Sequence, residues 1–180
     1  MNWCCFLFCN LILVYFATAF SSLGHFQATI LRVYSLLEWI EEVLKDLPKL
    51  RTGPMNKFED RLFLTEINNC IAQSHEAYNK MLYRAALKSA FFEMQAAKQR
   101  YQSIASADAG MHRDLVAHFI EIQCLLISPI TPHICEHIWG MLGHNDSIMA
   151  ARWPCGGPVD HTLLRAGKHL EEVAHDLRLR

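Results

Sequence analysis

Residues 126–139 read LISPITPHICEHIW, and this stretch decides the fold. Pro129 cannot continue a helix, because its nitrogen carries no hydrogen and its ring clashes with the preceding turn. Thr131 is a residue type that caps helix N-termini, and Pro132 suits the first helical position, where no amide hydrogen is needed. The stretch therefore predicts two helices joined by a tight elbow.

The sequence on both sides of the elbow has the periodicity of amphipathic helices. Apolar residues recur at steps of four and three over residues 26–47, and Pro48 ends the pattern. Asn56 followed by Glu59 predicts a capping box that opens the next helix, which should break at residues 79–80. Further helices are expected at about residues 83–104, 111–127, 132–142 and from 160 onward. The sequence contains no apolar alternation of period two that would predict a strand. The predicted fold class is therefore all-α, a helical bundle of five to six helices.

The apolar stripes of these helices supply the predicted core. Residues 111–127 contain too many apolar positions for a one-sided helix, so this helix should lie in the middle of the bundle. Trp153 and Pro154 follow in a loop that is expected to fold back onto the bundle. The main core positions predicted from spacing are Phe26, Leu37, Leu44, Tyr83, Leu87, Met94, Leu115, Phe119 and Leu126.

The first twenty residues differ from the rest of the chain. Residues 1–20 carry no charge, and Ala17-Thr18-Ala19 is similar to a signal cleavage site, although the usual positive start is absent. A run of about twenty apolar residues would also suit a membrane helix. We therefore divide the chain into a leader, residues 1–25, and a helical bundle, residues 26–180, which is expected to continue past its last residue. The leader is interpreted as a signal or anchor, or as translated sequence foreign to the fold.

Charge and cysteine content limit the possible functions. The chain has 17 Lys and Arg against 18 Asp and Glu, so any affinity for nucleic acid must come from a local basic face. Its seven cysteines are odd in number and lack paired spacing, which favours reduced, buried thiols over a disulfide framework.

Several stretches together carry a family resemblance. Besides the elbow, these are YNKM at residues 78–81, AALK at 85–88, FFEMQAAK at 91–98 and ARWP at 151–154. They resemble the anticodon-binding helical domain of class I aminoacyl-tRNA synthetases. The longer match through residues 78–101 and 119–139 resembles the cytosolic leucyl members of that class. The resemblance covers about residues 29–180, so the leader has no counterpart in the family.

The resemblance implies a tRNA-binding domain of a leucine–tRNA ligase-like protein, acting in translation in the cytoplasm with a leucine-type tRNA as partner. Full-length members use ATP and magnesium, which they hold with signatures that this sequence lacks, so we expect no cofactor and no catalytic residue in this chain. Aminoacylation would need the missing synthetase domains, in the same protein or in a partner chain. The alternative is a membrane-anchored or secreted helical interaction protein that reuses the bundle.

One helix carries the candidate tRNA contacts. At about 100° per residue, the cations and the amide of residues 84–98 fall on one face, and Lys80 extends this face at the helix start. Such a face could follow the phosphates of an RNA stem without reading its sequence. The alternative is that these side chains only solvate an exposed helix. The predicted tRNA-binding residues are Lys80, Arg84, Lys88, Gln95 and Lys98. Further candidates are Arg51, Lys57, Arg61 and Arg113, whereas Phe91 is assigned to the core.

The elbow also matches the H-x-x-E-H pattern of inverted zincins. His133 and His137 would lie on one helix face, with Glu136 beside them. A zinc site needs a third ligand, for which Glu171 or Glu172 could be imagined, and short motifs often match by chance. We therefore predict no metal site and assign this segment to packing, with Ile138 and Trp139 as its anchors.

Overall fold

The computed structural model describes residues 23–107 and 110–178. Residues 1–22, which make up most of the predicted leader, lie outside the described residues, as does the side chain of Phe26. The chain divides into two units, each described here by itself. One combines the residues up to Lys49 with Ile127–Ala151, and the other combines Leu50–Leu126 with Arg152–Arg180.

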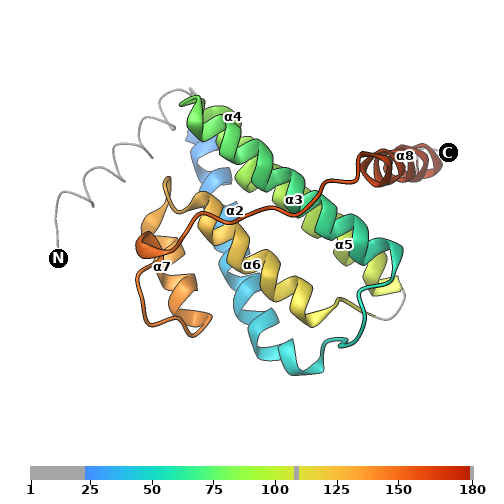
Figure 1. Ribbon diagram of the computed structural model, residues 1–180, viewed down its shortest axis with the longest axis horizontal. Coiled ribbons are helices and arrows are strands. Elements are labelled where there is room, and N and C mark those ends of the chain that lie inside the picture. The colour runs from blue at the N-terminus through green and yellow to red at the C-terminus, as the bar shows by residue number, and fades with distance from the viewer. Residues whose placement is uncertain (1–22, 108–109, 179–180) are drawn as a thin grey trace. The chain divides into compact units, whose positions relative to one another are not determined.

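The all-α prediction is confirmed. The described residues form six helical rods, in which α4 and α5 belong to one continuous rod, and they contain no strand (Figure 1). The extended pairing found among them is a single bridge between Arg51 and His112.

The first unit contains α2, Leu23–Asp46, and α7, Pro132–Met141. Helix α2 passes into a short 3-10 turn, Leu47–Lys49, where Pro48 was predicted to end it. The buried side chains of α2 are Leu36, Ile40 and Val43, and the predicted Leu37 and Leu44 are only half-buried. Ile40 lies in the predicted stripe of residues 26–47, so the buried face overlaps that stripe and is rotated from its centre toward Leu36 and Val43.

The elbow forms as predicted, with a different cap. Helix α6 ends at Ile127, and Pro132 occupies the first turn of α7. The backbone N–H groups of Ile130 and Thr131 both donate to the Ile127 carbonyl, at 2.9 and 3.0 Å, which closes the elbow. Thr131 is the N-cap by position, but its hydroxyl does not cap α7 and instead lies 3.5 Å from the Ile127 carbonyl. The Thr131 side chain therefore contacts the last carbonyl of α6 and not the first turn of α7.

The second unit contains α3, Phe58–Asn79, α4, Tyr83–Leu87, α5, Met94–Ala107, α6, Arg113–Ile127, and α8, His161–Arg178. Residue Ile127 itself belongs to the first unit. Helix α3 runs alongside the rod formed by α4 and α5 (Figure 1). Phe63 of α3 stacks on Tyr101 of α5, with ring centroids 4.5 Å apart, and lies 5.3 Å from Phe119 of α6. These three rings form the centre of the unit.

Helix α6 is buried almost all round, as its apolar content predicted. Leu115, Phe119 and Leu126 are each exposed by 1% or less. The hydroxyl of Tyr78 in α3 donates to the Leu126 carbonyl at 2.9 Å, which ties the end of α3 to the end of α6. The predicted packing of this helix within a bundle is confirmed for the second unit.

A buried polar network holds the loop before α3. Asp60 is fully buried, and its carboxylate accepts two hydrogen bonds from Arg51, at 2.6 and 2.7 Å, and one from the Tyr101 hydroxyl at 2.7 Å. The Tyr101 oxygen accepts from the His112 backbone N–H at 2.8 Å, and His112 Nε2 lies 2.9 Å from the Gly53 carbonyl. Burial raises the pKa of Tyr101 to about 12. The network therefore joins two loops to α3 and α5.

The predicted start of α3 was wrong. The N-cap is Lys57 and not Asn56, and no side chain caps this helix. Glu59 does not reach back to a cap, and its carboxylate lies 3.8 Å from Lys57 Nζ. The loop is instead held by the Arg51 hydrogen bonds to the side chain of Asp60, in the first turn of α3.

The predicted break after α3 is confirmed. The N–H of Leu82 donates to the Ala77 carbonyl at 2.9 Å, and the N–H of Met81 donates to Tyr78 at 3.0 Å. This is a Schellman motif, in which the residue after the C-cap adopts a left-handed conformation. That residue is Met81, with φ +55°, where glycine is usual.

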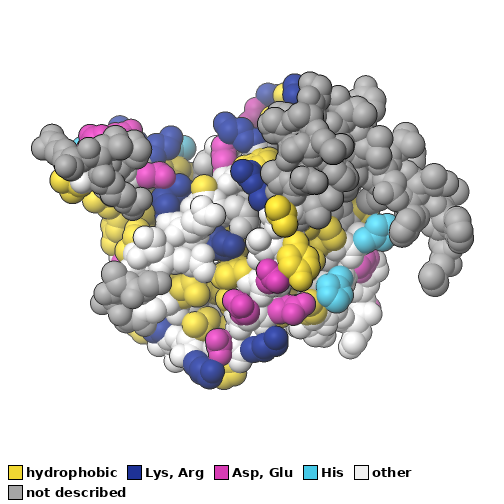
Figure 2. Space-filling model, turned by 180° about the vertical axis from the view of Figure 1, so that it is seen from behind, with side chains coloured by type: hydrophobic (Ala, Val, Ile, Leu, Met, Phe, Trp, Pro, Cys, Tyr) yellow, Lys and Arg dark blue, Asp and Glu magenta, His cyan; other side chains and the backbone are white. Residues whose placement is uncertain are grey.

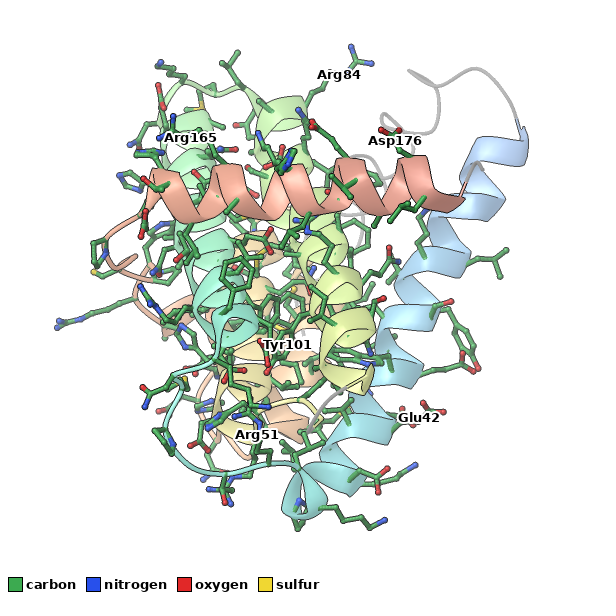
Figure 3. All side chains as sticks on the ribbon, turned by 90° about the vertical axis from the view of Figure 1, so that its right-hand side faces the viewer. Glu42, Arg51, Arg84, Tyr101, Arg165 and Asp176 are labelled. Carbon is green, nitrogen blue, oxygen red and sulfur yellow. The ribbon has the colours of Figure 1, made fainter. Side chains whose placement is uncertain are left out.

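The last helix begins as predicted and leaves most of its second half exposed. Asp160 accepts hydrogen bonds from the backbone N–H groups of Thr162 and Leu163, at 2.9 and 3.1 Å, which caps α8. Helix α8 crosses α3 and α5 (Figure 3) and comes closest at Gly167, where a Cβ would lie 2.8 Å from a Leu62 methyl carbon. Beyond the crossing, Leu170, Val173 and Leu177 are exposed.

The loop before α8 folds back as expected. The Trp153 ring lies 5.5 Å from Tyr78 and 6.1 Å from His75, both on α3. Asn68 of α3 accepts a hydrogen bond from the Gly157 backbone at 3.0 Å, which fixes the loop further along. Among the cysteines, Cys70, Cys124 and Cys135 are free and buried as predicted, and Cys155 is exposed.

Candidate nucleic-acid interface

The helix that carries the candidate contacts is not a regular α-helix. Residues Lys88–Glu93 form a π-helical segment between α4 and α5. A π segment adds one residue to the turn, which rotates everything after it by about 100° relative to a regular helix. The Ser89 hydroxyl bonds to the Ser74 hydroxyl of α3 at 2.8 Å and lies 3.1 Å from the Ala86 carbonyl. These buried contacts accompany the change in helical register.

The register change divides the five predicted residues into two groups. Before the π segment the rod buries Ala86, within it Ser89, Ala90 and Phe91 are buried, and after it the buried side chains include Met94, Lys98 and Tyr101. The predicted single face, which assumed one regular helix, was therefore wrong. For the same reason, Tyr83 is exposed and Leu87 is half-buried, although both were predicted in the core. Phe91 is buried, as predicted.

The outer group consists of Lys80, Arg84 and Lys88, all of which are exposed. Lys80 Nζ donates to Glu76 at 2.6 Å, and this hydrogen bond lowers the pKa of Glu76. Lys88 Nζ lies 3.5 Å from the Glu93 carboxylate. Arg84 projects outward at one end of the second unit, away from Arg51 and Tyr101 (Figure 3). Surface ion pairs of this kind are weak and exchange readily for other anions.

The inner group consists of Gln95 and Lys98. Gln95 is half-buried, and its Nε2 donates to Gln123 of α6 at 2.9 Å. Lys98 is only 8% exposed, and burial lowers the pKa of its ammonium from 10.5 to about 8. Both side chains therefore lie in the packing of α5, where a phosphate has little access.

Replacing Lys98 by Met is expected to stabilise the fold by up to about 3 kcal/mol at neutral pH, because burial lowers the pKa of the ammonium from 10.5 to about 8 and one pKa unit corresponds to about 1.4 kcal/mol. The pKa is lower in the folded chain than in the unfolded chain, so the burial penalty is complete below pH 8 and falls as the pH rises from 8 to 10.5. Urea unfolding of both proteins should show a smaller difference at about pH 9.5 than at about pH 7. Lys80→Met, at an exposed site, is the matched control and should change stability by less than about 0.5 kcal/mol. A Lys98→Met variant less stable than wild type at pH 7 would contradict this account.

The turn between α3 and α4 exposes an apolar tip that the sequence did not predict. Met81, Leu82 and Tyr83 are 69%, 53% and 52% exposed, and the Tyr83 hydroxyl lies 3.2 Å from Met81 Sδ. We call these three residues the hairpin tip. The only sequence signal for it is the predicted helix break, which places Tyr83 at a helix start and not in a helix interior.

The other candidate cations lie elsewhere. Arg51 is committed to Asp60 in the buried network, so it is structural. Arg113 is exposed beside Asp114, with Nε 3.1 Å from the carboxylate, and Arg61 is exposed on α3. Figure 2 shows cations and carboxylates interspersed on the face that it presents. By contrast, the stretch from Ala77 to Phe92 has three cations and no carboxylate.

The H-x-x-E-H segment has a structural use. The Glu136 carboxylate accepts hydrogen bonds from the Ser147 hydroxyl and, at 3.3 Å, from the Ile148 backbone, so it holds the 3-10 turn Ile148–Ala150 against α7. Ile138 and Trp139 are buried, as their anchoring role requires. Across residues 23–107 and 110–178, no three His, Cys, Asp or Glu side chains are grouped as a metal site would need.

Within residues 23–107 and 110–178, no helix combines the length and the apolar character needed to cross a bilayer.

The sequence of this chain is similar to the sequences of known proteins. Residues 60–178 match a family model described as the anticodon-binding domain of tRNA ligase. The chain is 51% identical over 154 residues to a cytoplasmic leucine–tRNA ligase of Pongo abelii, which covers 86% of this chain and 13% of that protein. For the cytoplasmic leucine–tRNA ligase of Saccharomyces cerevisiae the identity is 39% over 154 residues, covering 84% and 14%. A leucine–tRNA ligase of Aeropyrum pernix is 30% identical over 98 residues, covering 54% and 10%. The chain thus spans about one seventh of the length of the first two relatives.

Proposed function

The chain belongs to the anticodon-binding domain family of tRNA ligases, and from this premise we propose that it binds tRNA through the outer cations Lys80, Arg84 and Lys88. The observation that carries the proposal is that the stretch from Ala77 to Phe92 holds three cations, all of them exposed, and no carboxylate, in a chain of net charge −1. Phosphates attract such a stretch without any need for base recognition.

Gln95 and Lys98 are left out of the proposed interface. Gln95 is engaged with Gln123, and Lys98 is almost buried. The proposal therefore keeps three of the five residues predicted from the sequence and replaces a helix-long stripe by a patch at one end of the rod.

The substrate that we propose is a leucine-accepting tRNA, because the similar proteins named above are leucine–tRNA ligases. The cytoplasm is the proposed compartment on the same grounds. We propose that the chain contributes tRNA affinity to aminoacylation, and that the ATP- and magnesium-dependent step belongs to other ligase domains, in the same protein or in a partner chain. The relatives are about seven times longer than the matched region, which supports this division of roles.

Binding of a labelled leucine-accepting tRNA to the full chain tests the proposal. The dissociation constant should rise with salt, with a log–log slope of about 2 to 3 if three cations each meet one phosphate. Fluorescence anisotropy over about 50 to 200 mM salt measures this slope. Absence of binding at the lowest salt, or an affinity that does not respond to salt, would contradict the proposal.

A further inference from the structure

The hairpin tip has a backbone conformation that favours a different residue. Met81 adopts φ +55° at the Schellman position, where a side chain costs about 1 kcal/mol relative to glycine. Strain of this kind is tolerated where surrounding structure or function requires the side chain. Here the strained residue is 69% exposed, so its side chain contributes little to the core.

The tip is also apolar where solvent would favour polar residues. Leu82 and Tyr83 are both more than half exposed and lie next to Met81 in one turn. Neither residue is covered by another part of the second unit to the extent expected for a core side chain. An exposed apolar cluster with a polar rim marks an interaction site.

The rim of the tip consists of cations. Lys80 precedes the three residues, Arg84 follows them, and Lys88 lies one turn further along the rod. The nearest carboxylates in sequence are Glu76 and Glu93, which pair with Lys80 and Lys88. An aromatic ring beside cations suits an unpaired nucleotide, because the ring stacks on the base while the cations meet the phosphates.

We propose that the hairpin tip is a nucleotide-stacking site, where Tyr83, supported by Met81, receives an unpaired base of the bound tRNA. This inference rests on the proposed function and adds a contact that is not electrostatic. The Tyr83 hydroxyl donates a hydrogen bond to the Met81 sulfur at 3.2 Å, which ties the tyrosine side chain to Met81 within the hairpin tip. A protein partner would use the same apolar atoms, but it would not need the cationic rim.

Tyr83→Ala is expected to weaken binding of leucine-accepting tRNA by about tenfold, because stacking on an aromatic ring contributes about 1–3 kcal/mol per base. The loss should be the same at every salt concentration, since no charge is removed. Tyr83→Phe keeps the ring and should bind like wild type. Tyr34→Ala removes another tyrosine that is more than half exposed, and it serves as the matched control, with no expected change.

Met81→Gly distinguishes an effect on tRNA affinity from an effect on the stability of the fold. Glycine relieves the left-handed conformation, so this variant should melt at a higher temperature than wild type. It also loses the sulfur that accepts from the Tyr83 hydroxyl, so it should bind tRNA about threefold more weakly, a loss of about 0.7 kcal/mol. A variant that gains stability and loses affinity cannot owe its weaker binding to unfolding.

A fully paired RNA duplex is the second probe. It offers phosphates and no unpaired base, so wild type and Tyr83→Ala should bind it equally. If Tyr83→Ala binds tRNA as tightly as wild type, the stacking site is overturned and the tip is left for a protein contact. Equal losses on tRNA and duplex, or a loss in Tyr83→Phe as large as in Tyr83→Ala, would also overturn it. If wild type binds neither RNA, the proposed function fails and this inference fails with it.

Discussion

Asp60→Asn is expected to lower the free energy of unfolding by about 3 kcal/mol. The Asp60 carboxylate is fully buried and accepts three hydrogen bonds, two of them from the guanidinium of Arg51. Removing one partner of a buried ion pair costs about 3–5 kcal/mol, because the other charge is left without compensation. The Arg51 side chain is 17% exposed and can recruit some water, so the lower end of that range applies.

Urea unfolding at neutral pH measures this effect. Asp46→Asn is the matched control, because Asp46 also accepts from a cation, Lys49 at 2.6 Å, but at a site where both side chains are more than half exposed. Its expected cost is below about 1 kcal/mol. Similar losses in the two variants would mean that the buried network adds no more than a surface pair, contrary to its geometry.

Reversing Arg84 and Lys88 to Glu together is expected to weaken tRNA binding by about a hundredfold. Each reversal replaces attraction to a phosphate with repulsion, which we estimate at about tenfold, or about 1.4 kcal/mol. Both side chains are exposed, so the fold should tolerate the change. Arg165→Glu with Lys168→Glu is the matched control, an exposed pair of cations on α8 that should leave the affinity close to that of wild type.

The elements that the sequence predicted well are those set by local chemistry. Pro129 and Pro132 fix the elbow without help from distant residues. Asp160 caps α8 through its own side chain, and Gly143 adopts φ +90° just after α7, which was predicted to end at about residue 142. Each of these signals acts within a few residues, so a single sequence is enough to read it.

The features that were missed depend on residues far apart in the chain. Asp60 meets Arg51 and Tyr101, and Tyr101 meets the His112 backbone, only in the folded protein, and this network, not a cap at Asn56, fixes the loop before α3. The π segment lies where Ser89 meets Ser74 of α3, a pairing that no local spacing reveals. Register within a helix is therefore decided partly by packing.

Packing between helices also explains why only some of the predicted tRNA-binding residues lie on the surface. Arg84 precedes the π segment and Lys88 is its first residue, so a regular helical wheel places both correctly on the outside. Lys98 follows that segment, and the wheel then assigns a nearly buried lysine to the surface. Fold class and family could be read from the sequence, whereas the division between outer and inner contacts required the structure.

The central claim, that the outer cations hold tRNA phosphates, is tested most directly by measuring the salt dependence of leucine-accepting tRNA binding for wild type and for the Arg84→Glu, Lys88→Glu variant side by side. The account predicts a linear log–log plot for wild type and a slope smaller by about 2 for the variant, one for each lost phosphate contact. Two plots with the same slope would contradict it, because the phosphates would then be met by other residues.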